Sequence, residues 1–393
     1  MKSVSSENFA DRFDSLRPYY DSEVPGVLKK LSHDPEFQAA MAHYYLPRLD
    51  AVFPWLAQAI AGYGLRRKSR GVNSIADFQL HIATFMESMQ KRTVDDLIIE
   101  GLDELDPKTP WLFISNHRDI SLDPAFIDLA LHLKGRDTVR IAIGDNLLEK
   151  PFVSALMRLN KSFIVPRSSA GKREMLKAFQ LLSEYIQYSI QHDQHSIWLA
   201  QRQGRAKDGI DRTDPGIIKM LSMAQRSQNR DMPMADIFKS LNIVPVSISY
   251  EYDPCDVNKA RELLAQEQGQ KYKKVEFEDM HAIAAGITGY KGRVKLHFGQ
   301  PLNERDFNST DELVHEIDRQ VLSNYQLFPP HYLALEKLGE HPELVDTSHI
   351  SEEERSKFEE RYQGVPDELK RWWLTEYANP VINKKAPQAL PDE

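Results

Sequence analysis

A histidine and two aspartates stand close together between two apolar segments of this sequence. Residues 114–124 read Ile-Ser-Asn-His-Arg-Asp-Ile-Ser-Leu-Asp-Pro and contain His117, Asp119 and Asp123. An imidazole can remove a proton from a hydroxyl at neutral pH, and a carboxylate on its other ring nitrogen would fix the tautomer and stabilise the imidazolium. The apolar run 111–114 precedes this stretch, and a second apolar run begins at residue 125. We therefore expect His117 to be a general base where a strand ends and a helix begins.

Both aspartates are near enough in sequence to pair with the ring of His117. Asp123 has a purely structural alternative, because it directly precedes Pro124 and is a candidate N-cap of the following helix. The residue types alone leave open which carboxylate is the partner.

Short apolar runs alternate with helical patterns through the middle of the chain, which is typical of an α/β fold with a largely parallel sheet. Active sites in such sheets lie at the carboxyl ends of the strands, where we expect His117. The predicted strands are 97–101, 111–115, 139–143, 162–165, 196–200, 243–249 and 293–298, and the predicted helices between them include 124–133, 147–159, 171–191 and 215–226.

The two ends of the chain carry additional helical patterns. We expect three regions: a helical N-terminal extension (1–92), an α/β domain (93–305), and a C-terminal helical region with an acidic tail (306–393). The prolines and mixed composition at the end predict a loose chain from Pro380 to Glu393. An aromatic segment, 53–60, stands near the basic cluster 66–70. It predicts either contact with an anionic membrane or an ordinary core helix with a charged end, and we favour the core helix.

Four segments resemble, in order, the motifs of the glycerolipid acyltransferase superfamily, which includes the glycerol-phosphate and lysophosphatidate acyltransferases. They cover about residues 95–255, and each follows or forms a predicted strand. The segments are Asn116-His117 followed by an aspartate, the run 162–167 that ends in Arg167, the run 197–205 that contains Gln203-Gly204-Arg205, and the proline-containing strand 243–248.

The resemblance implies a layered α/β acyltransferase fold with helical additions at both ends, and an O-acyltransferase that transfers a fatty acyl group. His117 would be the base, with Asp123 or Asp119 beside it, and no metal or other cofactor would be needed. The donor would be acyl-CoA or acyl carrier protein, and the acceptor a hydroxyl of glycerol 3-phosphate or a lysophospholipid. Arginine binds phosphate through a bidentate fork. The substrate-binding candidates are Arg118, Arg167, Arg202, Gln203, Gly204, Arg205 and Lys207.

Two departures from the family pattern bear on this interpretation. The family places four residues between the histidine and the aspartate, whereas five separate His117 from Asp123. Either a one-residue bulge preserves that pair, which we favour, or Asp119 replaces Asp123. The usual glutamate of the third motif is Gln203, which favours a different lipid or metabolite hydroxyl as the acceptor. A lipid- or carrier-binding relative without catalysis is a further alternative.

Composition limits the other classes of function. The formal net charge of -8 argues against binding to nucleic acid. Between residues 136 and 230, 16 Lys/Arg stand against 9 Asp/Glu, so a basic middle lies within an acidic chain and suits an anionic ligand. A single cysteine, no long apolar run and no apolar segment at residues 1–7 predict a protein that is cytoplasmic or bound peripherally at the inner membrane face.

Overall fold

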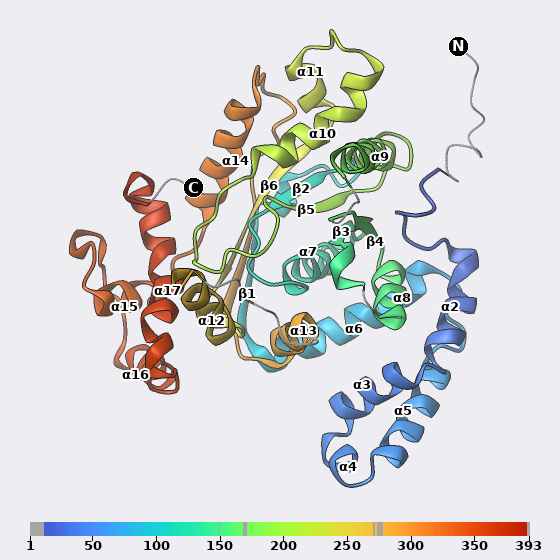
Figure 1. Ribbon diagram of the computed structural model, residues 1–393, viewed down its shortest axis with the longest axis horizontal. Helices are drawn as coiled ribbons and strands as arrows, with labels where there is room; N and C mark the ends of the chain where they lie inside the picture. The colour runs from blue at the N-terminus through green and yellow to red at the C-terminus, as the bar shows by residue number, and fades with distance from the viewer. Residues whose placement is uncertain (1–11, 149, 168–170, 270–271, 273–277, 391–393) are drawn as a thin grey trace. The chain divides into compact units, whose positions relative to one another are not determined.

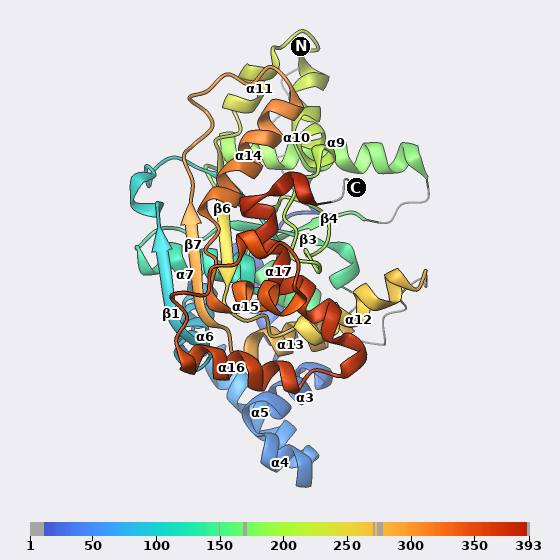
Figure 2. The same cartoon turned by 90° about the vertical axis from the view of Figure 1, so that its left-hand side faces the viewer.

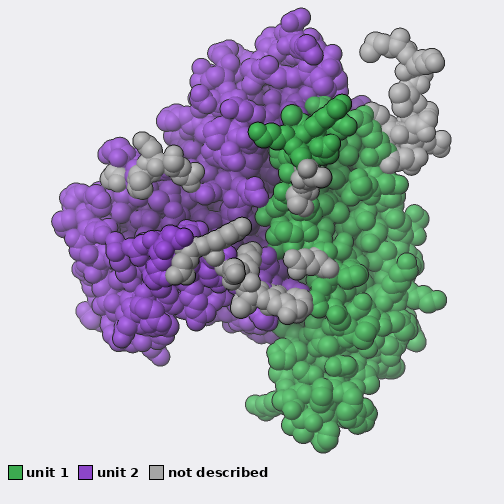
Figure 3. Space-filling model, in the orientation of Figure 1, with its two compact units in different colours: residues 1–85, 139–185 green, residues 86–138, 186–393 purple. Residues whose placement is uncertain are grey.

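The computed structural model describes residues 12–148, 150–167, 171–269, 272 and 278–390. Its contacts divide the chain into a smaller unit, residues 1–85 with 139–185, and a larger unit, residues 86–138 with 186–393 (Figure 3). Helices α6 (Ile75–Thr93) and α9 (Lys172–Gln191) each contribute residues to both units. Both units are discontinuous in sequence, whereas the expected boundaries at residues 92 and 305 cut the chain into consecutive pieces, and those boundaries stay a prediction.

Among the described residues, the larger unit contains five strands in the order β1-β7-β6-β2-β5. Strand β2 pairs in parallel with both β5 and β6, and β1 pairs in parallel with β7. Only the β6–β7 pair among these is antiparallel. The predicted largely parallel α/β sheet is therefore confirmed. The strands are β1 (Val94–Glu100), β2 (Leu112–Ser115), β5 (Ile197–Ala200), β6 (Ile243–Tyr250) and β7 (Gly292–Phe298).

Burial accounts for the apolar sequences of β2 and β6. Every residue of β2 and of β6 is buried, as expected for strands that are covered on both faces. Strand β7 alternates between buried and half-buried residues instead. The helices of the larger unit are α7 (Leu122–Leu133), α10 (Pro215–Gln228), α11 (Met234–Lys239), α12 (Asp256–Glu267), α13 (Glu278–Thr288), α14 (Thr310–Asn324), α15 (Pro329–Leu338), α16 (Glu352–Gln363) and α17 (Lys370–Lys385).

The smaller unit contains one parallel pair of strands, β3 (Arg140–Gly144) and β4 (Ser162–Val165). Four of its helices begin at a proline and α2 has one at its second position, since proline is favoured in the first turn of a helix. These helices are α2 (Val24–Leu31), α3 (Pro35–Tyr45), α4 (Pro47–Val52), α5 (Pro54–Lys68) and α8 (Pro151–Leu159).

The C-terminal region corrects one expectation. Helix α17 continues through Pro380 to Lys385, so the prediction of a loose chain from residue 380 is wrong for this part of the tail. Residues 391–393 lie outside the described residues. Trp373, Tyr377 and Val381 follow one another at intervals of four and are all buried, in a core that α17 shares with α15 and α16 (Figures 1 and 2). Burying each such side chain contributes about 1.5–3 kcal/mol, which offsets the roughly 3 kcal/mol that an interior proline costs a helix.

None of the helices in the described part of the chain is both long enough and apolar enough to span a bilayer. Residues 1–7, on which the expectation about the N-terminus rested, lie outside the described part of the chain.

Candidate active site

The first site element is a histidine–aspartate pair directly after strand β2. Nδ1 of His117 lies 2.8 Å from Oδ2 of Asp123, and the His117 side chain is 11% exposed while that of Asp123 is fully buried. A carboxylate only accepts hydrogen bonds, so Nδ1 carries the hydrogen and Nε2 is the nitrogen that can accept a proton. The ring also packs against Trp198 of β5 in a T-shaped arrangement, with a centroid separation of 5.9 Å. This arrangement suits a general base.

The carboxylate of Asp123 is held by more than the histidine. Its Oδ2 accepts the backbone N–H of Arg118 at 2.7 Å and that of Asp119 at 3.0 Å. Its Oδ1 accepts the hydroxyl of Tyr250, at the end of β6, at 2.8 Å. The turn between His117 and Asp123 therefore curls its own N–H groups onto the carboxylate. This turn accommodates the extra residue that separates the pair in sequence.

Asp119 has a different task. Its Oδ1 accepts the backbone N–H groups of Ser121 at 2.9 Å and Leu122 at 2.8 Å, where helix α7 begins. Burial, and next the charge of Asp123, raises the pKa of Asp119. The expectation that Asp123 is the N-cap is wrong, since Ser121 occupies that position and Asp123 lies within the helix. The structure thus pairs Asp123 with the histidine and uses Asp119 to start the helix.

Arg118 is buried and points toward the loop after β5. Its Nη2 donates to Oδ2 of Asp211 at 2.6 Å and to the carbonyl of Gly209 at 3.1 Å. Its guanidinium also lies 5.0 Å from the ring centroid of Tyr325. Burial lowers the pKa of Arg118, but Asp211 and its neighbours more than offset this and raise it. The geometry favours a role in holding the loop, while the predicted contact with substrate stays a prediction.

Asn116 ties the same turn to the sheet. Its Oδ1 accepts the N–H of Ile248 at 2.8 Å, and its Nδ2 donates to the carbonyl of Ile248 at 2.9 Å. The side chain thereby continues the β2–β6 ladder one step beyond Ser115 and Val246. This fixes the position at which the chain turns toward His117.

The loop after β5 carries the predicted third motif. Arg205 is nearly buried, with a side chain 9% exposed, and its Nη2 lies 3.9 Å from Oε1 of Glu262. Its Nη1 is buried and makes no hydrogen bond to any described residue. Lys207 pairs with the same Glu262. Two cations thus face one carboxylate, and Asp119 and Asp253 add further negative charge around Arg205.

The remaining predicted residues lie as follows. Gln203 is exposed and Arg202 is half-buried. Gly204 has a φ of +81°, a conformation that glycine adopts without strain. Arg167 follows β4 in the smaller unit, where its N–H donates to Asp145 at 3.2 Å and its side chain fills the space beside Gly144. The substrate-binding roles of these residues stay predictions.

Sequence reasoning missed two residues that complete the site. Tyr250 lies 127 positions after Asp123, and Asp211 lies 93 positions after Arg118. Tyr250 could have been noticed, because it ends a strand parallel to β2 and so lies at the same edge of the sheet. Asp211 stands in an irregular loop and gives no comparable signal.

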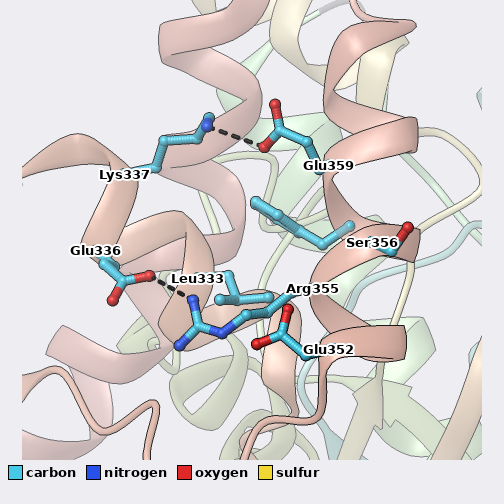
Figure 4. A pocket seen from close by; sticks show the side chains of 8 residues that line it. Leu333, Glu336, Lys337, Glu352, Arg355, Ser356 and Glu359 are labelled. Atoms are coloured by element: carbon cyan, nitrogen blue, oxygen red, sulfur yellow. Dashed lines mark hydrogen bonds and ion pairs between the residues drawn. The ribbon is translucent and has the colours of Figure 1, made fainter.

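Two other features of the described residues concern a metal site and a surface hollow. No group of three or more His, Cys, Asp or Glu residues there is arranged to hold a metal ion. A hollow of about 550 Å³ between α15 and α16 contains none of the predicted site residues. Its charged walls pair with one another, Lys337 with Glu359 at 3.0 Å and Arg355 with Glu336 at 3.1 Å (Figure 4).

Comparison with known proteins assigns the class of this site. Residues 96–249 match the family model described as Acyltransferase, a segment that contains the His117–Asp123 pair, the loop after β5 and all of β6 except its last residue, Tyr250. The resemblance to the acyltransferases, drawn from the motifs, is therefore confirmed over these residues.

The other two comparisons add little. A crystal structure of the 1-acyl-sn-glycerophosphate (LPA) acyltransferase PlsC from Thermotoga maritima is similar at 16% sequence identity and a TM-score of 0.40, over 73% of this chain and 92% of that chain. A search of curated protein sequences finds no match.

Proposed function

We propose that this protein transfers a fatty acyl group from a thioester to a hydroxyl of glycerol 3-phosphate or a lysophospholipid, with His117 as the general base. The donor is acyl-CoA or acyl carrier protein. The observation that carries the proposal is the His117–Asp123 pair, in which Nδ1 is bonded to a buried carboxylate 2.8 Å away, within an acyltransferase segment.

The reaction follows from the tautomer. Nε2 of His117 takes the proton from the acceptor hydroxyl as its oxygen attacks the thioester carbonyl carbon. Asp123 stabilises the imidazolium that forms. The tetrahedral intermediate collapses, the C–S bond breaks, and the imidazolium returns its proton to the thiolate. The products are an ester and a free thiol, so the reaction needs no electron transfer and no cofactor.

Charge near the third motif supports an anionic acceptor. Arg205 offers a buried Nη1 that has no hydrogen-bond partner among the described residues, and Lys207 adds a second cation. A buried donor without a partner is costly, so a phosphate oxygen would be a favourable ligand. Gln203 beside them can bond a polyol hydroxyl without charge. It favours, as a second candidate, an acceptor hydroxyl on another lipid or metabolite.

The smaller unit supports contact with an anionic membrane surface, where lipid substrates reside. Large apolar side chains stand exposed along α4, α5 and the residue between them, and the last turn of α5 is basic. Such a combination favours an interface between apolar chains and anionic head groups. The residues are Val52 (66% exposed), Phe53 (50%), Trp55 (69%), Ile60 (45%) and Tyr63 (62%), with Arg66, Arg67 and Lys68.

The membrane proposal is tested by sedimentation with phosphatidylglycerol vesicles and with phosphatidylcholine vesicles. Trp55→Ser should weaken binding to the anionic vesicles, whereas Leu133→Ser, at an apolar residue of α7 that is 52% exposed, should not. Equal binding by wild type and both variants would refute this assignment of the surface.

The catalytic proposal is tested with purified protein, labelled acyl-CoA and labelled acyl carrier protein. Glycerol 3-phosphate, lysophosphatidate and an uncharged lipid alcohol are offered as acceptors. We expect a labelled ester with a phosphate-bearing acceptor. An ester formed only with the uncharged alcohol would favour the second candidate, and no transfer from either donor to any acceptor would overturn the proposal.

A further inference from the structure

We propose that the C-terminal helix α17 positions part of the active site, with Asn379 and Asn383 as positioning residues. They hold the loop of residues 201–214, called here the third-motif loop, which carries Arg205 and Lys207. The inference rests on the proposed function, because it concerns how the acceptor's anionic group is bound.

The third-motif loop has no regular structure of its own. It runs from the end of β5 at Ala200 to the start of α10 at Pro215. Gly204 and Gly209 have φ values of +81° and +80°, so both adopt the left-handed conformation that glycine takes without strain. A segment without internal helix or strand bonds takes its position from the groups that contact it.

One set of contacts comes from the His117 turn. The N–H of Gln201 donates to the carbonyl of Ser115 at 2.7 Å, and the N–H of Ala206 donates to the carbonyl of His117 at 2.8 Å. The ion pair of Arg118 with Asp211 adds a third attachment. The loop is thereby fixed to the residues around the proposed base.

The second set comes from one face of α17. Nδ2 of Asn379 donates to the carbonyl of Asp208 at 2.8 Å, and Oδ1 of Asn383 accepts the N–H of Asp211 at 2.8 Å. Gly209 packs against this helix so closely that a Cβ there would lie 2.2 Å from the carbonyl oxygen of Glu376. Residues 376, 379 and 383 are spaced by three and four, so they share one face of the helix.

Helix α17 is a rigid support for this loop. Trp373 and Tyr377 on it are buried in the C-terminal core. Glu376 also accepts from the buried Lys259 of α12 at 2.8 Å. Precise sites are more readily built on such packed elements than on free loops.

The polar side chain of Asn383 indicates that α17 positions the third-motif loop and does not merely cover the core. This side chain is only 3% exposed, and an apolar residue would serve a helix that merely covers a core. Its oxygen instead meets a loop N–H that would otherwise be buried without a partner. Two hydrogen bonds hold the backbone on either side of Lys207. Ala206, which is attached to the His117 turn, stands between Arg205 and Lys207, and Asp208, which is attached to α17, directly follows Lys207. Freeing one of them would therefore move the cations.

The test uses Asn379→Ala, Asn383→Ala and the double variant, with Thr375→Ala as the matched control. The Thr375 hydroxyl bonds only within its own helix, to the carbonyl of Arg371. Each lost hydrogen bond should raise KM for the phosphate-bearing acceptor about 2- to 10-fold, and more in the double variant. KM for the acyl donor should change by less than about 2-fold, and Thr375→Ala should match the wild type.

A second readout does not depend on activity. Trypsin can cleave after Arg202, Arg205 and Lys207, so loosening of the loop should speed cleavage there in the asparagine variants while the far-UV circular dichroism spectrum stays as in the wild type. If the wild type transfers no acyl group, the proposed function fails, yet faster cleavage still supports the attachment by α17. Unchanged cleavage with unchanged acceptor KM would overturn the inference. So would an equal rise in both KM values.

Discussion

Replacing Asp123 by asparagine separates the charge of this side chain from its hydrogen bonds. Oδ2 accepts two backbone N–H groups, from Arg118 and Asp119, in addition to the ring of His117. An amide nitrogen at that position would face three donors, so the asparagine must place its oxygen there. Its NH2 group then meets the Tyr250 hydroxyl, which can accept. Nδ1 of His117 keeps an acceptor, and the tautomer is preserved.

The expected magnitudes follow from these contacts. A hydrogen bond to a charged group contributes about 1.5–3 kcal/mol and a neutral one about 0.5–1.5 kcal/mol, so Asp123→Asn should weaken support of the imidazolium by about 1–2 kcal/mol. That corresponds to a loss of about 5- to 30-fold in kcat/KM. Asp123→Ala instead leaves the donors of Arg118, Asp119 and Tyr250 buried without partners. It should lower the free energy of unfolding by about 3–6 kcal/mol.

The assay is acceptor-dependent thiol release from an acyl thioester, measured beside urea unfolding of the same preparations. The asparagine variant should keep the wild-type unfolding midpoint and lose a modest part of its activity. A folded asparagine variant as inactive as His117→Ala would refute the argument that the amide orientation is fixed. Full activity would refute any role for the carboxylate charge.

Three further perturbations have calculable outcomes. Burial raises the pKa of Asp318 to about 6, above its ordinary 3.8, so the folded protein binds an extra proton between these pH values. The free energy of unfolding therefore falls by about 3 kcal/mol as pH rises from 3.8 to about 6. This pH dependence should disappear in Asp318→Asn, as measured by urea titration from about pH 4 to 7. Trp373→Ala should destabilise the protein by about 3–5 kcal/mol, and a loss below about 1 kcal/mol would contradict its place in the C-terminal core. Gly209→Ala should cost more than about 2 kcal/mol by differential scanning calorimetry, because a Cβ there meets Glu376 at a φ of +80°, and an unchanged melting temperature would contradict that contact.

Local patterns predicted most of the sheet because its strands are short apolar runs between turns. Strand β4 has the expected bounds of Ser162–Val165, and β2 begins one residue later than expected, at Leu112. The end of the chain was misjudged because Pro380 is a strong local signal against a helix. The opposing forces are long-range: Val381 and Ile382 are buried against α15, and no pattern within residues 380–393 reveals that surface.

The site residues likewise fall into those that local sequence could predict and those that only tertiary contacts bring in. His117 and Asp123 are six positions apart, so their pairing could be proposed from the sequence, although the choice against Asp119 needed the turn geometry. Asp211 and Asn383 join the site only through tertiary contacts, Asp211 with Arg118 and Asn383 with the backbone of Asp211. Neither residue stands in a periodic pattern or a motif that would mark it.

The central claim is that His117 is the base that activates the acceptor hydroxyl. The most direct test compares wild type with His117→Ala in acceptor-dependent transfer of a labelled acyl group from its thioester to a phosphate-bearing hydroxyl, with both proteins at saturating substrate. The account predicts that the alanine variant unfolds as a cooperative unit, as the wild type does, and transfers at least about 100-fold more slowly. A folded alanine variant that transfers at the wild-type rate would contradict it.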